Sequence, residues 1–224
     1  MSSRTISVIG TAGRGETGAR VTRDLYDAMY AEVRSTAMEW GVDSAVSGGA
    51  AVADHLAVRG FLEGVFSRLT LFLPARFEAG RFIPNPDIRF NPGRTLTHYH
   101  ETFSTACSLD SLAELRQAIE KGARVEVREG FHRRNLEVAA ACSHMIALTF
   151  GTDLAFSNDT VTGAGHSGDF LDRHEGFRLH TAAGLCDGGT AHTWDACWKA
   201  DIKRHVNLTF LERSLSLQSA SPQP

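Results

Sequence analysis

The chain has 224 residues, of which 42% are hydrophobic and 22% are charged, a balance typical of an ordinary globular protein. The formal net charge of −3 argues against a protein whose main task is to neutralise nucleic-acid phosphates. No apolar run reaches membrane-spanning length and no charged-then-apolar leader begins the sequence, so we expect a cytoplasmic protein with no membrane partner.

The first third of the chain alternates between strands and helices. Ile6–Gly10 predicts a buried strand followed by a glycine-rich loop, and residues 21–39 show the apolar spacing of a helix. A second strand, 44–46, enters the turn 47–50, and a helix of about 52–67 and a third strand, 69–73, follow. Such alternation predicts a parallel sheet covered by helices.

Two long excursions interrupt the later pattern, at about 75–107 and 151–186, and we expect them to form a lid or a dimer surface. The elements expected outside them are a helix at 112–121 capped by Asp110 or Ser111, a strand at 123–128, a helix at 136–142, a strand at 145–150, a helix opening at Asp187 and a last strand at 206–211. The fold class is therefore α/β, a single Rossmann-like doubly wound domain over residues 1–213, with a disordered Ser/Gln/Pro-rich tail at 214–224.

The turn Ser47-Gly48-Gly49-Ala50 is the first candidate ligand site. Two adjacent glycines allow unusual backbone angles and close approach of a ligand to main-chain N–H groups. A helix that starts just after them directs its unpaired N–H groups and positive dipole end at the same point, which suits a phosphate. Asp54 is expected on the first turn of that helix, where it caps the helix or reaches a ribose hydroxyl.

A second turn of the same kind, Asp187-Gly188-Gly189-Thr190, precedes the late helix. Loops at the carboxyl ends of neighbouring strands in a doubly wound sheet converge on one crevice. Each turn alone is explained by a tight bend, but the pair favours a phosphate site. Arg133-Arg134-Asn135 offers two readings: an arginine that binds phosphate beside an asparagine that reads a ligand, or a solvated basic turn with an asparagine cap.

Other chemistries have weaker signals. Histidine-rich groups occur around His98, His100 and Glu101 and in the second excursion (His166, Asp169, His174, His180), but neither has zinc-site spacing, so we expect no metal. No GxSxG elbow surrounds Ser47, and no P-loop occurs. Cys107, Cys142, Cys186 and Cys197 lack CxxC spacing and are expected to be reduced, mostly buried thiols.

Taken together, these pieces resemble the SLOG superfamily of Rossmann-like domains, which includes the LOG phosphoribohydrolases and the DNA-processing A proteins. The resemblance covers roughly residues 6–200. It rests on the first strand and its loop through Arg14, on Ser47-Gly-Gly-Ala50 with Asp54, on Arg134-Asn135 before an alanine-rich helix, and on Gly188-Gly-Thr190.

The resemblance implies a nucleotide or nucleotide-derived ligand at the carboxyl ends of the strands, no separate cofactor, and a homodimer. It implies the following ligand-binding residues: Gly10, Thr11, Arg14, Ser47, Gly48, Gly49, Ala50, Asp54, Arg134, Asn135, Gly188, Gly189 and Thr190. The glycines and Thr190 would hold the phosphate, and Arg134 matches the arginine that LOG enzymes use near the ribose phosphate.

The sequence departs from the LOG pattern PGGxGTxxE, because Asp187 replaces the proline and Thr193 stands where the glutamate belongs. Cleavage of an N-glycosidic bond needs a carboxylate, and the candidates are Asp195 and Glu101, acting with Arg134. We therefore expect a nucleotide-binding sensor or carrier. The alternatives are a nucleoside-monophosphate phosphoribohydrolase and a DNA-processing A-type binder of single-stranded DNA, although nucleic acid is disfavoured by the charge.

Overall fold

The computed structural model describes residues 4–87, 91–150, 160–162 and 188–220. Its centre is a seven-stranded sheet in the order β6-β3-β2-β1-β7-β9-β8, in which all neighbours pair in parallel except β8 with β9. The strands are β1 (Thr5–Gly10), β2 (Ser44–Ser47), β3 (Arg68–Leu73), β6 (Arg124–Val127), β7 (His144–Thr149), β8 (Thr160–Thr162) and β9 (Ile202–Asn207). The predicted doubly wound α/β fold is confirmed.

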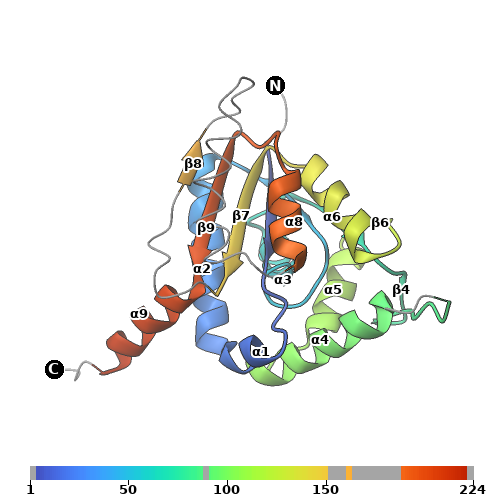
Figure 1. Ribbon diagram of the computed structural model, residues 1–224, viewed down its shortest axis with the longest axis horizontal. Coiled ribbons are helices and arrows are strands. Elements are labelled where there is room, and N and C mark those ends of the chain that lie inside the picture. Colours follow the sequence, from blue (N-terminus) through green and yellow to red (C-terminus); the bar gives the residue numbers. More distant parts are fainter. Residues whose placement is uncertain (1–3, 88–90, 151–159, 163–187, 221–224) are drawn as a thin grey trace.

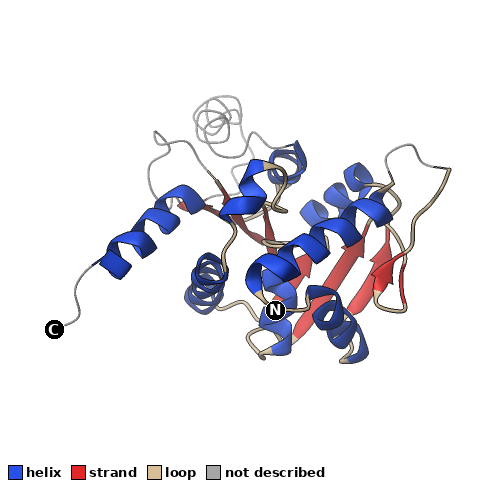
Figure 2. Cartoon of the chain, turned by 90° about the horizontal axis from the view of Figure 1, so that it is seen from below, coloured by secondary structure: helices blue, strands red, loops and turns tan. Residues whose placement is uncertain are grey.

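Helices connect the strands and cover both sides of the sheet, as Figures 1 and 2 show. They are α1 (Glu16–Arg20), α2 (Arg23–Trp40), α3 (His55–Leu62), α4 (Pro92–Cys107), α5 (Ser111–Glu120), α6 (Phe131–Ala140), α8 (Gly188–Ala196) and α9 (Leu208–Ala220). Predicted helix starts are visible in their caps: the Thr22 side chain accepts a hydrogen bond from the Leu25 N–H, and the Asp110 side chain accepts one from the Ala113 N–H.

Two separate cores lie on the two faces of the sheet because successive strand side chains point to opposite sides. In β1, Ile6 and Val8 belong to the larger core, which α2, α3, α4 and α5 cover, whereas Ile9 belongs to the smaller core under α6 and α8. In β7, Ile146 and Met145 divide in the same way.

The chain runs outward from β1 through β2 and β3 to β6, then returns to β7 and β9 on the other side of β1. Parallel crossovers are nearly always right-handed, so this reversal of direction moves the connecting helices to the opposite face. The reversal separates the carboxyl ends of β1 and β7, and this is the position at which open α/β sheets bind ligands.

Several sequence boundaries need correction. The third helix starts at His55 rather than just after the glycines, since Val52 has a positive φ of 62° that a helix does not accept. The excursion at 75–107 contains a small hairpin, β4 (Phe77–Glu78) with β5 (Arg81–Phe82), and then helix α4, which Asn91 caps. The second excursion lies outside the described residues apart from β8.

The carboxyl-terminal end also differs from expectation. The last strand begins at Ile202 and ends at Asn207, where the Asn207 side chain accepts a hydrogen bond from the Thr209 N–H and helix α9 starts. The expected disordered tail is therefore wrong for residues 214–220, which continue α9; residues 221–224 lie outside the described residues. Figures 1 and 2 show α9 pointing away from the sheet. None of the described helices combines the length and apolarity needed to cross a membrane.

Candidate functional site

A cleft lies at the switch point between β1 and β7. Its volume is about 790 Å³, including the part that is open to solvent. The lining residues come from the ends of β1 and β7, the loops after β1, β2 and β7, and helices α4, α6 and α8. They are Ile9, Gly10, Thr11, Ala12, Arg14, Ala50, Asp54, Leu96, Tyr99, Phe131, Arg134, Asn135, Thr149, Phe150, Gly189, Thr190 and Thr193. The structure thus brings together most of the predicted ligand-binding residues.

The cleft contains a buried ion pair. Arg134 Nη1 lies 3.3 Å from Asp54 Oδ2, and both side chains are more than nine-tenths buried. Burial raises the pKa of Asp54, and the charge of Arg134 opposes this rise. Burial also lowers the pKa of Arg134, and the nearby positive charge of Arg14 adds to this decrease. Among the described lining residues, two arginines and one carboxylate leave one excess positive charge.

One arginine nitrogen in this pair has no partner within the described part of the chain. Arg134 Nε is buried and makes no hydrogen bond there. An unsatisfied buried donor of a charged group costs about 1–3 kcal/mol or more. Arg134 therefore lines the cleft with a cationic side chain whose Nε donor the described protein atoms leave unsatisfied.

The Ser47–Ala50 turn uses its N–H groups internally. The Gly49 N–H donates to Ser47 Oγ (3.1 Å), and Ser47 Oγ donates to the Asp54 carbonyl (2.8 Å). The Ala50 N–H donates to Asp54 Oδ2 at 3.3 Å, and the Gly48 backbone also contributes a hydrogen bond to that carboxylate. The prediction that Gly48 and Gly49 hold a phosphate is therefore corrected: the turn positions Asp54 instead.

Each glycine of this turn occupies a position where a side chain would clash with a neighbouring residue. A Cβ atom on Gly48 would lie 1.8 Å from Arg134 Nη1, so the guanidinium packs directly against the backbone. Gly49 has φ of +65°, and a Cβ there would lie 2.3 Å from Leu73 Cδ2. Ser47, Gly48 and Gly49 are thus behind the wall of the cleft, whereas Ala50 and Asp54 are part of it.

Gly49→Ala is expected to lower the free energy of unfolding by about 3 kcal/mol, through the left-handed backbone and the contact with Leu73. Gly64→Ala is the matched control, because Gly64 has φ of +84° and open space around its missing Cβ. It should cost only the backbone contribution, about 1 kcal/mol. Urea unfolding measures both; equal losses would contradict the role of the Leu73 contact.

Helix α8 enters the cleft with its amino-terminal end. Thr190 Oγ1 donates to the Gly10 carbonyl at 2.8 Å, which fastens the helix to the end of β1. Asn135 Nδ2 donates to the Gly189 carbonyl at 3.1 Å and thereby joins α6 to α8. Thr190 and Asn135 therefore hold the walls of the cleft, while the positive end of the α8 dipole adds to its attraction for anions. Gly188 begins the helix, and Asp187 lies outside the described residues.

Aromatic side chains form much of the remaining wall. Tyr99 lies in α4, Phe131 is the first residue of α6, and Phe150 directly follows β7. The Arg14 guanidinium lies 5.7 Å from the centre of the Tyr99 ring. These rings give the site flat apolar surfaces beside its cationic groups. None of the three was predicted as a site residue, because single aromatic residues carry no recognisable spacing in a sequence.

Neither carboxylate proposed for catalysis reaches the cleft. Asp195 and Glu101 are both exposed and do not line it. Each lies two residues beyond a lining residue of its helix, Thr193 in α8 and Tyr99 in α4, and two residues turn an α-helix by about 200°. The side chains of Asp195 and Glu101 therefore face away from the cleft. Among the described lining residues, Asp54 is the carboxylate.

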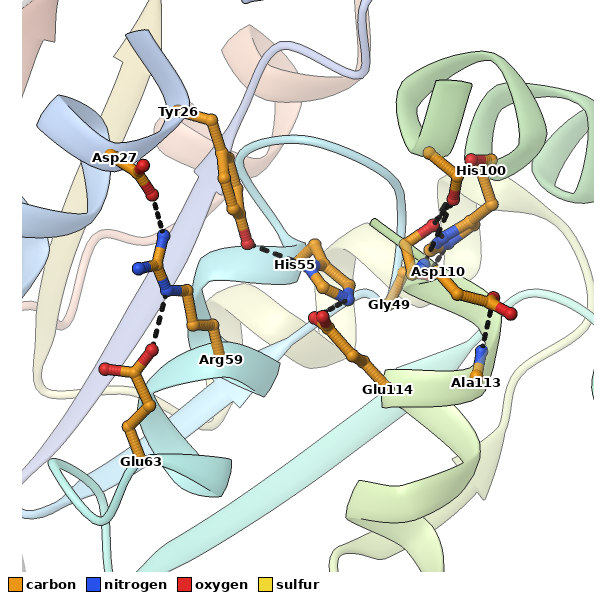
Figure 3. A network of polar contacts seen from close by, with 12 residues as sticks. Tyr26, Asp27, Gly49, His55, Arg59, Glu63, His100, Asp110, Ala113 and Glu114 are labelled. Carbon is orange, nitrogen blue, oxygen red and sulfur yellow. Dashed lines mark hydrogen bonds and ion pairs between the residues drawn. The ribbon is translucent and has the colours of Figure 1, made fainter. Parts of the chain in front are cut away.

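His100 belongs to a buried support behind the turn (Figure 3). Its Nε2–H donates to the Gly49 carbonyl at 3.1 Å, and its Nδ1 lies 2.9 Å from Ser111 Oγ. Burial lowers the pKa of His100 to about 4, so the ring is neutral and Nδ1 accepts. The signal for this role was its spacing with Leu96 and Phe103, which places His100 on the buried face of α4.

His55 lies beside His100, with 6.1 Å between the ring centres. Its Nδ1 is 2.8 Å from the Tyr26 hydroxyl, and its Nε2 is 3.4 Å from Glu114 Oε2, as Figure 3 shows. Burial, together with the neighbouring His100, lowers the pKa of His55 to about 3. This imidazole follows Asp54 directly and anchors the start of α3 in the larger core.

The described residues contain no cluster of three or more metal-ligating side chains. His98 and Glu101 are exposed on α4, whereas His100 is buried and bonded to Gly49 and Ser111, so these residues do not converge. His166, Asp169, His174 and His180 lie outside the described residues.

No family model matches the chain, and no solved structure matches it. A curated relative does match: uncharacterized protein R261 of Acanthamoeba polyphaga mimivirus is 33% identical over 152 residues, which cover 65% of this chain and 81% of the viral protein. The chain therefore belongs to the same family as R261. The name of that relative states no activity, and membership of the SLOG superfamily remains a prediction.

Proposed function

We propose that this protein binds a nucleotide or a nucleotide-derived phosphorylated small molecule in the cleft between β1 and β7, as a sensor or carrier. The observation that carries the proposal is the cationic centre of the cleft, where buried Arg134 keeps an unpartnered Nε among the described atoms and Arg14 adds a second positive charge. An arginine fork suits phosphate because it donates two parallel hydrogen bonds.

The walls support the nucleotide part of the ligand. Tyr99, Phe131 and Phe150 present rings against which a planar base can stack, and the α8 amino terminus adds a positive dipole for phosphate. Inorganic phosphate alone would leave the aromatic walls without contacts.

A second candidate, phosphoribohydrolase activity, is favoured by one observation: Asp54 is a carboxylate in the cleft with a raised pKa, as a general acid or base requires. Against it stands the ion pair with Arg134, which commits one carboxylate oxygen to structure. Binding of single-stranded DNA has less support, because the described lining offers only two cationic side chains for a backbone of several phosphates. The homodimer remains part of the proposal; light scattering of the purified protein tests it.

A thermal-shift screen tests the proposal, using nucleoside mono-, di- and cyclic phosphates, ADP-ribose and NAD. A ligand present at one hundred times its Kd stabilises the folded state by about 2.7 kcal/mol. Chromatography of each hit after incubation then separates the candidates. Recovery of intact nucleotide supports a sensor or carrier, and recovery of free base with sugar phosphate supports the hydrolase. The absence of any hit would refute the proposal.

A further inference from the structure

A pair of thiols lies at the far ends of the two helices that form one side of the cleft. Cys142 follows α6 and Cys197 follows α8, and their sulfur atoms are 3.3 Å apart. Both side chains are buried in the smaller core, but the adjacent residues Ala141 and Trp198 are exposed.

The two thiols are not equivalent. The hydrogen bond from Cys142 lowers the pKa of Cys197, burial opposes this, and the positive charge of Lys203 and the Ala200 backbone reinforce the decrease. The same hydrogen bond, together with burial, raises the pKa of Cys142. Lys203 is held in place by the Trp194 carbonyl, 2.7 Å from Nζ. Cys197 is therefore the better thiolate, and Cys142 stands next to it with its proton.

We propose that Cys142 and Cys197 form a peroxide-sensitive pair that closes into an intramolecular disulfide. The Cys197 thiolate attacks one oxygen of hydrogen peroxide, which breaks the O–O bond, forms a sulfenic acid and releases hydroxide. Cys142 then gives its proton to that hydroxide, and its sulfur attacks the Cys197 sulfur and expels the sulfenic oxygen as a second hydroxide. The proton that Cys197 lost to solvent completes the balance: two thiols and one peroxide give one disulfide and two waters.

The Cys142–Cys197 disulfide would connect α6 and α8 at their carboxyl-terminal ends, away from the cleft. Near the cleft, Asn135 in the middle of α6 already joins that helix to Gly189 at the amino-terminal end of α8. The disulfide would close a chain segment of 55 residues and would restrict the unfolded state as well as the separation of α6 from α8. The thiol pair does not depend on the ligand, so it can be tested whether or not a nucleotide binds.

The experiment treats the full-length wild-type chain with a few equivalents of hydrogen peroxide, followed by non-reducing peptide mapping by mass spectrometry. The expected product is a peptide pair linked through Cys142 and Cys197, lighter by two hydrogens, with Tm raised on the order of 5–10 °C and restored by a reductant. Cys107→Ser is the matched control, because Cys107 is buried in the other core and should not affect the reaction.

Cys197→Ser should abolish the linked product, and Cys186→Ser should leave it unchanged. The proposal is overturned if both thiols stay reduced in excess peroxide, if either sulfur links to another cysteine, or if Cys197 proceeds to sulfinic acid without linking. These outcomes are read on the wild-type chain, so they hold even where a variant folds poorly.

Discussion

Arg134→Met is expected to lower the affinity of the cleft for a nucleotide anion by about 100-fold and the free energy of unfolding by about 3 kcal/mol. The substitution removes the buried cation that faces the ligand and leaves the Asp54 carboxylate without its partner. Removing one member of a buried ion pair costs more than the pair itself contributes, because the remaining charge is uncompensated.

Two controls separate these effects. Arg133→Met changes the exposed neighbouring arginine and should alter neither quantity by much. Asp54→Asn combined with Arg134→Met should restore most of the lost stability, because no buried charge remains, but should not restore binding. Calorimetric titration and urea unfolding measure the two effects. Equal affinities of the Arg133 and Arg134 variants would contradict the role given to Arg134.

Acidification is expected to destabilise the protein strongly between pH 6.5 and pH 4, through His55 and His100. Their pKa values fall to about 3 and about 4 in the folded protein because both rings are buried, whereas an unfolded histidine titrates near 6.5. The unfolded chain therefore takes up protons first, and the stability present above pH 6.5 is lost as the pH falls toward the folded values. At pH 5 the loss is roughly 2 kcal/mol per histidine.

His100→Gln tests this account, since a glutamine amide can still donate to the Gly49 carbonyl but does not titrate. The loss of stability from pH 7.5 to pH 5, measured by urea unfolding, should fall by roughly 2 kcal/mol, which is the contribution of His100. His98→Gln, an exposed histidine of the same helix, is the control and should leave the loss unchanged. Glu114 faces His55 and has a pKa raised by burial, so its protonation on acidification favours the folded state and opposes the effect of the histidines. This contribution is the same in the wild type and in both variants. An undiminished loss in His100→Gln would contradict the assignment.

The order of elements could be predicted from the sequence because apolar spacing reports strands and helices locally. The predicted strands at 6–10, 69–73 and 145–150 agree with β1, β3 and β7 to within a residue. The ends of elements are harder to predict, because they depend on particular backbone angles and caps. Val52 delays the start of α3, and the Asn207 side chain caps the start of α9 at a position where the sequence predicts a continuing strand.

The candidate site shows the same division. Arg134, Asp54 and Arg14 could be found because turns after parallel strands converge on the switch point. The hydrogen bonds that the Ser47–Ala50 N–H groups make within the turn could not be predicted, since they depend on how the Asp54 side chain folds back onto that turn. Asp195 failed as a candidate because a change of two positions along a helix reverses the direction of a side chain.

The most direct test of the nucleotide-binding cleft is a calorimetric titration of the wild-type chain with the best-binding mononucleotide and with its dephosphorylated nucleoside. If Arg14 and Arg134 anchor the phosphate while aromatic walls hold the base, the nucleotide should bind at least about tenfold more tightly than the nucleoside, and Gly48→Ala should remove most of this difference by displacing the Arg134 guanidinium. Equal affinities for nucleotide and nucleoside, or a phosphate preference that survives both Gly48→Ala and Arg134→Met, would contradict the account.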